Sequence, residues 1–232
     1  MMISPTVFAE MELKGKSKEE ILTAIRSIKR EINRLKKVIE AGKNSPEYFI
    51  EPSPSTRLYW NREYLAEAIK AYKEAGGEYI PTKAEQKDQE FNEALNHLEQ
   101  VKFTYGGYLI GEEERISSVN DDIVSVESNS YSLPPKIDEE DDHEPWTKED
   151  FISEMKELHI GEWKHTYEDL CFEEGIQWEL EIKFSNGKRT ERYLGSNAYP
   201  YNFTDVLELF NVNEFLDEYD EDEEEDDEQN QN

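Results

Sequence analysis

Acidic residues are concentrated in one half of this 232-residue chain, and this asymmetry limits how the sequence can be organised. Residues 1–110 contain 17 Lys or Arg and 17 Asp or Glu, whereas residues 111–232 contain 9 and 38. The net charge of −29 therefore belongs entirely to the second half. A step of this size indicates two regions with different roles.

The first half predicts a mainly helical domain over residues 1–111. Ser17 and Glu20 form a capping box, and the apolar residues after it are spaced by four and three, as in a heptad seam that Gly42 ends. The seam consists of Ile21, Ile25, Ile28, Ile32, Leu35 and Ile39. This helix carries an excess of Lys and Arg, which favours a solvated face. The alternative is a surface for acidic residues of the tail or of a partner.

The rest of the first half predicts two further helices and a hairpin. One helix is expected from Leu58 to Ala75 and another after the capping box that begins at Thr82. The segment VKFTYGGYLIGE then predicts two short strands joined by the turn Gly106-Gly107.

The second half predicts a linker, a small domain and a tail. Residues 112–145 are polar and acidic and are expected to be a linker, and residues 146–213 to be a separate small α+β domain. Residues 214–232 are expected to be a disordered acidic tail. The fold class is therefore α+β, with helices first and an antiparallel hairpin in the second domain.

The segment IQWELEIKF has the alternation of a strand with one buried face. It places Trp178, Leu180 and Ile182 toward a core, and Glu179 and Glu181 toward solvent. Asn-Gly follows in the sequence SNGK, which predicts a tight turn back into a partner strand.

The stretch GSNAYPYNF, residues 195–203, joins this second strand to a final helix. Asn202 or Thr204 is expected to cap the helix, and the aromatic rings to pack over the sheet edge. The alternative is a ligand-binding loop that uses Asn197 and the exposed rings.

The order W-x-L-E-I-x-F-x-N-G, followed by G-S-N-A-Y-P-x-N-F and an apolar helix, resembles a small α+β domain of uncharacterised bacterial proteins, some of them on mobile elements. The resemblance covers residues 146–210. It implies a compact α+β unit and a bacterial or phage setting, and it brings no activity and no catalytic residues.

Catalytic, metal and membrane motifs are absent from the sequence. No H-E-x-x-H, G-x-S-x-G, C-x-x-C or phosphate-binding glycine pattern occurs, and no run of 18 apolar residues. We therefore expect no enzyme activity, no cofactor, no metal and no membrane contact. The single Cys171 and the lack of a leader-type start favour a cytoplasmic protein.

The charge distribution predicts an acidic interaction protein that blocks a basic surface of a nucleic-acid-handling or host-defence protein. It would act as a nucleic-acid mimic or anti-defence inhibitor and be encoded by a phage or mobile element. An immunity-type protein that neutralises a basic toxin is the alternative, and a small hydrolase with a site near residues 195–203 is a further one. Direct nucleic-acid binding is not expected, and the oligomeric state stays open. The candidate partner-binding residues are Glu154, Glu157, Glu179, Glu181, Tyr199, Tyr201 and Asn197.

Overall fold

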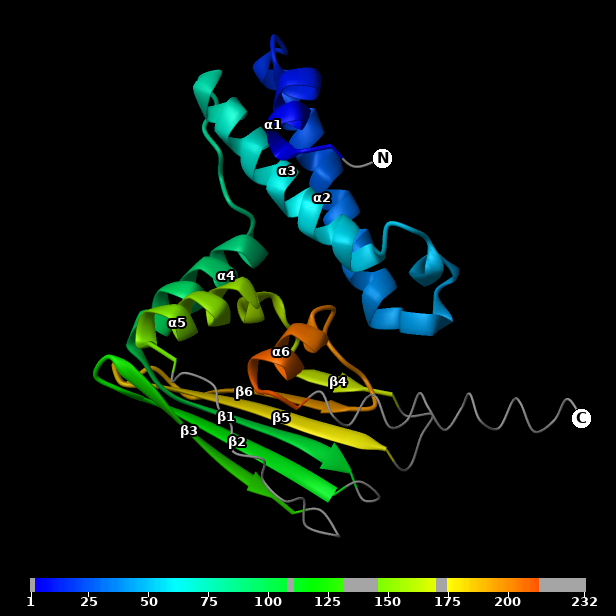
Figure 1. The fold of residues 1–232 in the computed structure, drawn as a ribbon. Coiled ribbons are helices and arrows are strands. Elements are labelled where there is room, and N and C mark those ends of the chain that lie inside the picture. Colours follow the sequence, from blue (N-terminus) through cyan, green and yellow to red (C-terminus); the bar gives the residue numbers. More distant parts are fainter. Residues whose placement is uncertain (1–2, 108–110, 132–145, 170–174, 213–232) are drawn as a thin grey trace, which may run out of the picture. The chain divides into compact units, whose positions relative to one another are not determined.

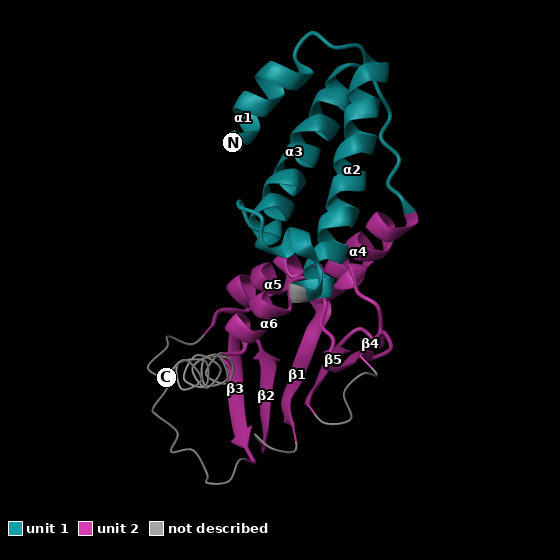
Figure 2. Cartoon of the chain, turned by 90° about the vertical axis from the view of Figure 1, so that its right-hand side faces the viewer, with its two compact units in different colours: residues 1–82 teal, residues 83–232 magenta. Residues whose placement is uncertain are grey.

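The chain forms two compact units, residues 1–82 and 83–232 (Figure 2). The computed structural model describes residues 3–107, 111–131, 146–169 and 175–212 (Figure 1). Together the units give the α+β class that the sequence predicts, with helices first and strands later.

Unit 1 is a helical hairpin with a short N-terminal cover. Helices α2 (Lys18–Ala41) and α3 (Pro54–Glu74) pack along each other, and the short turns η2 (Gly42–Asn44) and η3 (Pro46–Phe49) connect them (Figure 1). Before them, α1 (Pro5–Phe8) and the π-helical turn η1 (Ala9–Leu13) lie against α3. Phe8 stacks on Tyr64, whose hydroxyl donates a 2.6 Å hydrogen bond to the carbonyl of Ile3.

The capping box and the seam of α2 are confirmed. The side chain of Ser17 accepts from the backbone N–H of Glu20, and the carboxylate of Glu20 accepts from the backbone N–H of Ser17. The buried stripe runs from Ile21 to Leu35 as predicted but ends on Val38 in place of Ile39. A straight helix has 3.6 residues per turn, so a strict seven-residue repeat drifts off the buried face.

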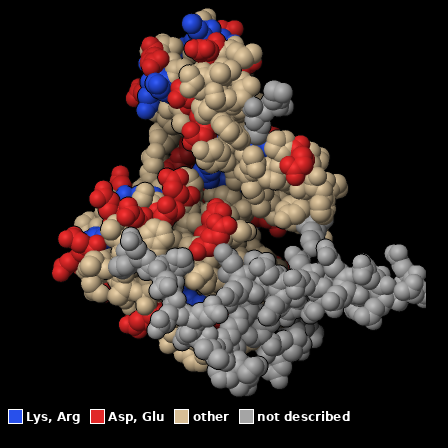
Figure 3. Space-filling view, viewed as in Figure 1, with Lys and Arg blue, Asp and Glu red and all other residues tan. Residues whose placement is uncertain are grey.

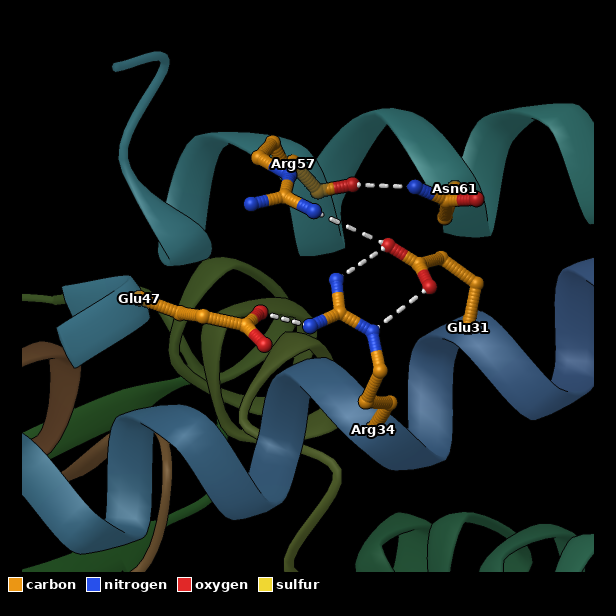
Figure 4. Close-up of polar contacts among 5 residues, drawn as sticks. All are labelled: Glu31, Arg34, Glu47, Arg57 and Asn61. Atoms are coloured by element: carbon orange, nitrogen blue, oxygen red, sulfur yellow. Dashed lines mark hydrogen bonds and ion pairs between the residues drawn. The ribbon is translucent and has the colours of Figure 1, made fainter. Parts of the chain in front are cut away.

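An ion-pair network joins α2 to α3 and to the connecting turn (Figure 4). Arg34 donates to both carboxylate oxygens of Glu31 and also pairs with Glu47 of η3. Arg57 of α3 donates to Glu31 over 3.1 Å, and the backbone carbonyl of Arg57 accepts from Asn61. The hydrogen bond from Arg34 holds the pKa of Glu31 below its ordinary value of 4.5.

Unit 2 is a six-stranded sheet with helices on one face. Its strands are β1 (Leu98–Gly107), β2 (Gly111–Asn120), β3 (Ile123–Ser130), β4 (Thr166–Glu168), β5 (Ile176–Phe184) and β6 (Glu191–Ser196). They lie in the order β3-β2-β1-β5-β6-β4, and every pairing is antiparallel except that of β4 with β6.

The helices α4 (Lys83–Ala94), α5 (Lys148–Glu157) and α6 (Phe203–Leu209), with the turns η4 (Leu95–His97) and η5 (Ile160–Glu162), cover one face of the sheet (Figure 1). Trp178, Leu180 and Ile182 are buried beneath them, as the strand alternation predicts. Phe203 of α6 packs on the rings of Trp178 and Phe103, with centroids 4.8 and 6.0 Å apart. Aromatic rings therefore form a large part of this core, beside its aliphatic side chains.

The predicted domain boundaries need correction. Residues 98–107 do not belong to the helical unit, because β1 pairs with both β2 and β5 near the centre of the sheet. Residues 111–130, expected as linker, form β2 and β3. The linker was predicted from the difference in charge between the two halves. Charged side chains on the exposed face of a strand do not prevent its backbone from pairing with neighbouring strands. The boundary lies instead after Thr82.

The first predicted hairpin turn is also wrong. Gly106 and Gly107 lie within β1, where Gly107 pairs with Gly111 of β2 and with Ile176 of β5. A side chain at Gly107 would come within 2.5 Å of the carbonyl oxygen of Gly175. Glycine is thus needed here for close strand approach and not for a turn. The remaining linker residues 132–145 and the predicted tail, 214–232, lie outside the described residues.

Candidate partner-binding surface

The sheet face opposite the helices, called the open face below, carries a ladder of charged side chains. Lys102 of β1 pairs with Glu114 of β2, and Arg192 of β6 pairs with Glu181 of β5. Lys183 lies 3.3 Å from Glu181 and also donates to Gln100 of β1. Cross-strand neighbours of opposite charge stabilise a sheet that has one polar face.

Glu181 is held by this ladder and is not free for a partner. Only 8% of the residue is exposed. Burial acts to raise the pKa of Glu181, but hydrogen bonds from Arg192 and Lys183 outweigh it and hold that pKa below its ordinary value of 4.5. Its neighbour Glu179 is half-buried, and a carboxylate oxygen lies 3.8 Å from Nε of Arg192.

A hollow of about 640 Å³ lies at the end of the open face where β1, β5, β6 and β4 meet the start of β2. Its carboxylates are Glu112, Glu168 and Glu179, and no Lys or Arg is among the described residues that line it. The side chains of Glu112 and Glu168 are exposed, and neither has a partner among the described residues. This feature is called the acidic hollow below.

Glycine creates the hollow, and apolar side chains border it. Gly106 is paired with Glu112 on one side and Gln177 on the other, so the open face lacks a side chain between them. Tyr131 and Leu194 also line the hollow and are 61% and 43% exposed. Exposed aromatic and aliphatic groups beside unpaired charges are typical of protein-binding surfaces.

The predicted acidic site residues fall on two separate surfaces. Glu154 and Glu157 are exposed on α5, on the helical face, where Figure 3 shows carboxylates gathered over α4 and α5. Glu179 and Glu181 project from the other face of the sheet, because strand alternation opposes them to Trp178 and Leu180. The four carboxylates therefore cannot form one patch, and only Glu179 lines the acidic hollow.

The predicted loop residues have structural contacts. Asn197 takes a left-handed backbone conformation with a φ of 52°, and its side chain accepts from the backbone N–H of Ile176. Tyr201 is buried, and its hydroxyl donates a 2.6 Å hydrogen bond to Glu162. The ring of Tyr199 packs against that of Phe203, and burial raises the pKa of Tyr199. This geometry supports the interpretation of the stretch as a strand-to-helix connection.

The predicted cap of α6 is replaced by a tertiary contact. Asn202 occupies the N-cap position but makes no side-chain capping bond. Its amide instead accepts from the indole N–H of Trp163 over 3.0 Å and donates to the carbonyl of Leu158. A local capping rule cannot show that distant partners compete for the same side chain.

Sequence reasoning missed Glu112, Glu168, Tyr131 and Leu194. Glu112 and Tyr131 lie in the segment expected as linker. They line the same hollow as Glu168 and Leu194 because β1 pairs with β5. The only local signal was Leu194, an apolar residue on the predicted returning strand.

Among the described residues, no group of three or more His, Cys, Asp or Glu side chains is arranged to hold a metal ion. In the same part of the chain, no helix has the length and apolarity needed to cross a membrane. Cys171 lies outside the described residues.

Comparisons with known proteins show no relationship. The chain matches no family model, no curated protein and no solved structure.

Proposed function

We propose that this protein binds a basic protein partner without catalysing a reaction, and that the acidic hollow is the centre of the binding surface. The observation that carries the proposal is the pair of exposed carboxylates of Glu112 and Glu168, which have no partner among the described residues, beside exposed Tyr131 and Leu194. A Lys or Arg side chain entering the hollow would meet carboxylates that no described Lys or Arg neutralises, with apolar contacts at the border.

The charge of unit 2 supports a basic partner. Residues 83–232 contain 12 Lys or Arg and 43 Asp or Glu, whereas residues 1–82 contain 14 and 12. Dense carboxylates accelerate encounter with a cation-rich surface and repel nucleic acid. Within this proposal the partner is a nucleic-acid-handling or host-defence protein in a phage or bacterial setting. That narrower proposal rests on the excess of carboxylates in residues 83–232. A basic toxin has the same chemistry and remains the alternative partner.

The proposal is tested with a peptide of about 12 alternating Lys and Thr residues, which when extended is slightly longer than the strands β1, β2 and β3. Its affinity is measured by fluorescence anisotropy for the full chain and for two double variants. Glu112→Gln/Glu168→Gln removes two charges from the hollow. Glu154→Gln/Glu157→Gln removes two exposed charges from α5 and is the control with equal net charge.

We expect the hollow variant to bind about tenfold more weakly and the α5 variant to bind nearly as the wild type does. Affinity should fall steeply between about 50 and 500 mM salt, because exposed charges are screened. Equal weakening in both variants would show that only the net charge matters. Amide NMR shifts confined to residues 213–232 would place binding on the tail and contradict the proposal.

A further inference from the structure

Strand β3 forms one margin of the sheet (Figure 2). Its inner edge pairs with β2 over its whole length, from Ile123 to Ser130. Beyond Val124 its residues are mostly exposed on both faces, and Val126 is 49% exposed. An edge of this length is a template for pairing with another chain unless it is blocked.

Two hydrogen bonds show which backbone groups point outward. The N–H of Val124 donates to the carbonyl of Trp146, and the N–H of Lys148 donates to the carbonyl of Asp122. Backbone groups alternate along a strand, so those of Val126 and Ser128 also point away from β2. Among the described residues, neither has a hydrogen-bond partner on that side.

The chain already places an antiparallel segment on the start of this edge. Thr147 forms a bridge with Ile123, flanked by the two hydrogen bonds above. The edge therefore accepts a strand in the antiparallel orientation. The first described residue of the segment that contains Thr147 is Trp146. The remaining edge lies next to the acidic hollow, since the N–H of Tyr131 donates to the carbonyl of Glu112.

The sequence of the edge does not protect it and favours a basic occupant. Residues 120–131 contain no Lys, Arg or Pro, which are residues that commonly block edges, and they contain Asp121, Asp122 and Glu127. Glu127 is exposed and lies opposite Ile116, on the open face.

We propose that the outer edge of β3 binds an extended segment of the basic partner as an added antiparallel strand. This inference rests on the proposed function and specifies how the partner docks. Segment residues opposite Val126 and Ser128 donate and accept the backbone hydrogen bonds. Residues opposite Glu127 project their side chains onto the open face, where Lys or Arg meets its carboxylate.

The alternation gives a test that leaves the protein unchanged. In the Lys–Thr peptide, Lys opposite Glu127 directs its own N–H away from β3, and the intervening Thr directs its N–H toward β3. Methylation of the Thr amides should therefore abolish binding to the full chain, whereas methylation of the Lys amides should preserve it. Equal affinity of the two methylated peptides would overturn the proposal.

Variants of the edge provide the second measurement. Val126→Pro removes an outward backbone N–H and leaves the hydrogen bonds with β2 intact. Val126→Thr keeps this backbone N–H and has a side chain similar in size to that of Val. We expect the unmethylated peptide to bind at least about tenfold more weakly to V126P than to V126T. Ser128→Pro and Ser128→Thr repeat the comparison, and thermal unfolding of each variant confirms that it is folded.

The outcomes separate this inference from the proposed function. If V126P binds like V126T while E112Q/E168Q binds weakly, the hollow binds the partner and the edge does not. If V126P binds weakly and the two glutamate variants behave alike, the edge inference stands without the hollow. A concentration-dependent dimer of the full chain that V126P abolishes would show that a second copy occupies the edge. If the wild-type chain is folded and does not bind the Lys–Thr peptide, both proposals are contradicted.

Discussion

Trp178 shows how one residue connects the fold to the loop that the sequence singled out. Its ring is 3% exposed and packs against Phe203, and its indole N–H donates to the carbonyl of Ala198 over 3.0 Å. A Cβ on Gly195 would lie 1.9 Å from the indole nitrogen, so the glycine makes room for the ring. The stretch 195–203 is thus organised around a buried tryptophan.

Replacement of this residue gives a prediction for stability. Trp178→Ala should lower the free energy of unfolding of unit 2 by roughly 3–5 kcal/mol, because a large buried aromatic is removed and a cavity remains. Urea denaturation followed by near-ultraviolet circular dichroism measures this change. Tyr59→Ala, at an exposed position of unit 1, is the control and should change stability little. A loss below about 1 kcal/mol for Trp178→Ala would contradict the core position assigned to this ring.

At the scale of elements, the two helices of unit 1 are joined by apolar packing and by the network at Glu31. Its carboxylate contacts Arg34 on the same helix and Arg57 on the other. Glu31 is about one-third exposed, so solvent screening reduces the value of each pair. The buried isoleucines therefore provide most of the stability of the hairpin, and the ion pairs adjust it.

Acid should weaken this helical hairpin partly through Glu31. Its folded-state pKa lies below the ordinary value of 4.5, so its contribution is complete above that value and is lost as the pH falls through the folded-state pKa. Glu31→Gln should reduce stability by at most about 1 kcal/mol at neutral pH. The difference between wild type and variant in thermal unfolding should shrink toward about pH 3.

The control for this prediction is Glu74→Gln, at an exposed position in the last turn of α3. Its difference from the wild type should stay small at both pH values. A constant difference between wild type and Glu31→Gln across the acid range would show that the ion pairs do not contribute as the geometry indicates.

For the whole molecule, the division into two units indicates where a protease should cut the chain. Residues 77–82 form neither helix nor strand and separate α3 from α4. Brief digestion with proteinase K should therefore cut near this connection and release a helical fragment of about 80 residues. Mass spectrometry identifies the fragments. Early cleavage inside β1 or β2 would mean that these strands are not part of a stable sheet.

The sequence by itself determined the features that depend on neighbouring residues. The box at Ser17, the buried stripe of α2 and the alternation around Trp178 follow from helix and strand periodicity, which residues within a few positions establish. The strand pair β5 and β6 is confirmed for the same reason, although the pairing ends at Ile182 with Glu191, so the connection is longer than the predicted tight turn.

Only the tertiary structure decided which distant segments meet. The pairing of β1 with β5 joins residues about 80 positions apart, and it brings the supposed linker into the sheet. It also assembles the acidic hollow, and contacts with the distant Trp163 and Leu158 replace the cap at Asn202. Periodicity shows which face of an element is buried but not which element covers it. Those partners are selected by the combined packing and hydrogen bonding of the whole unit.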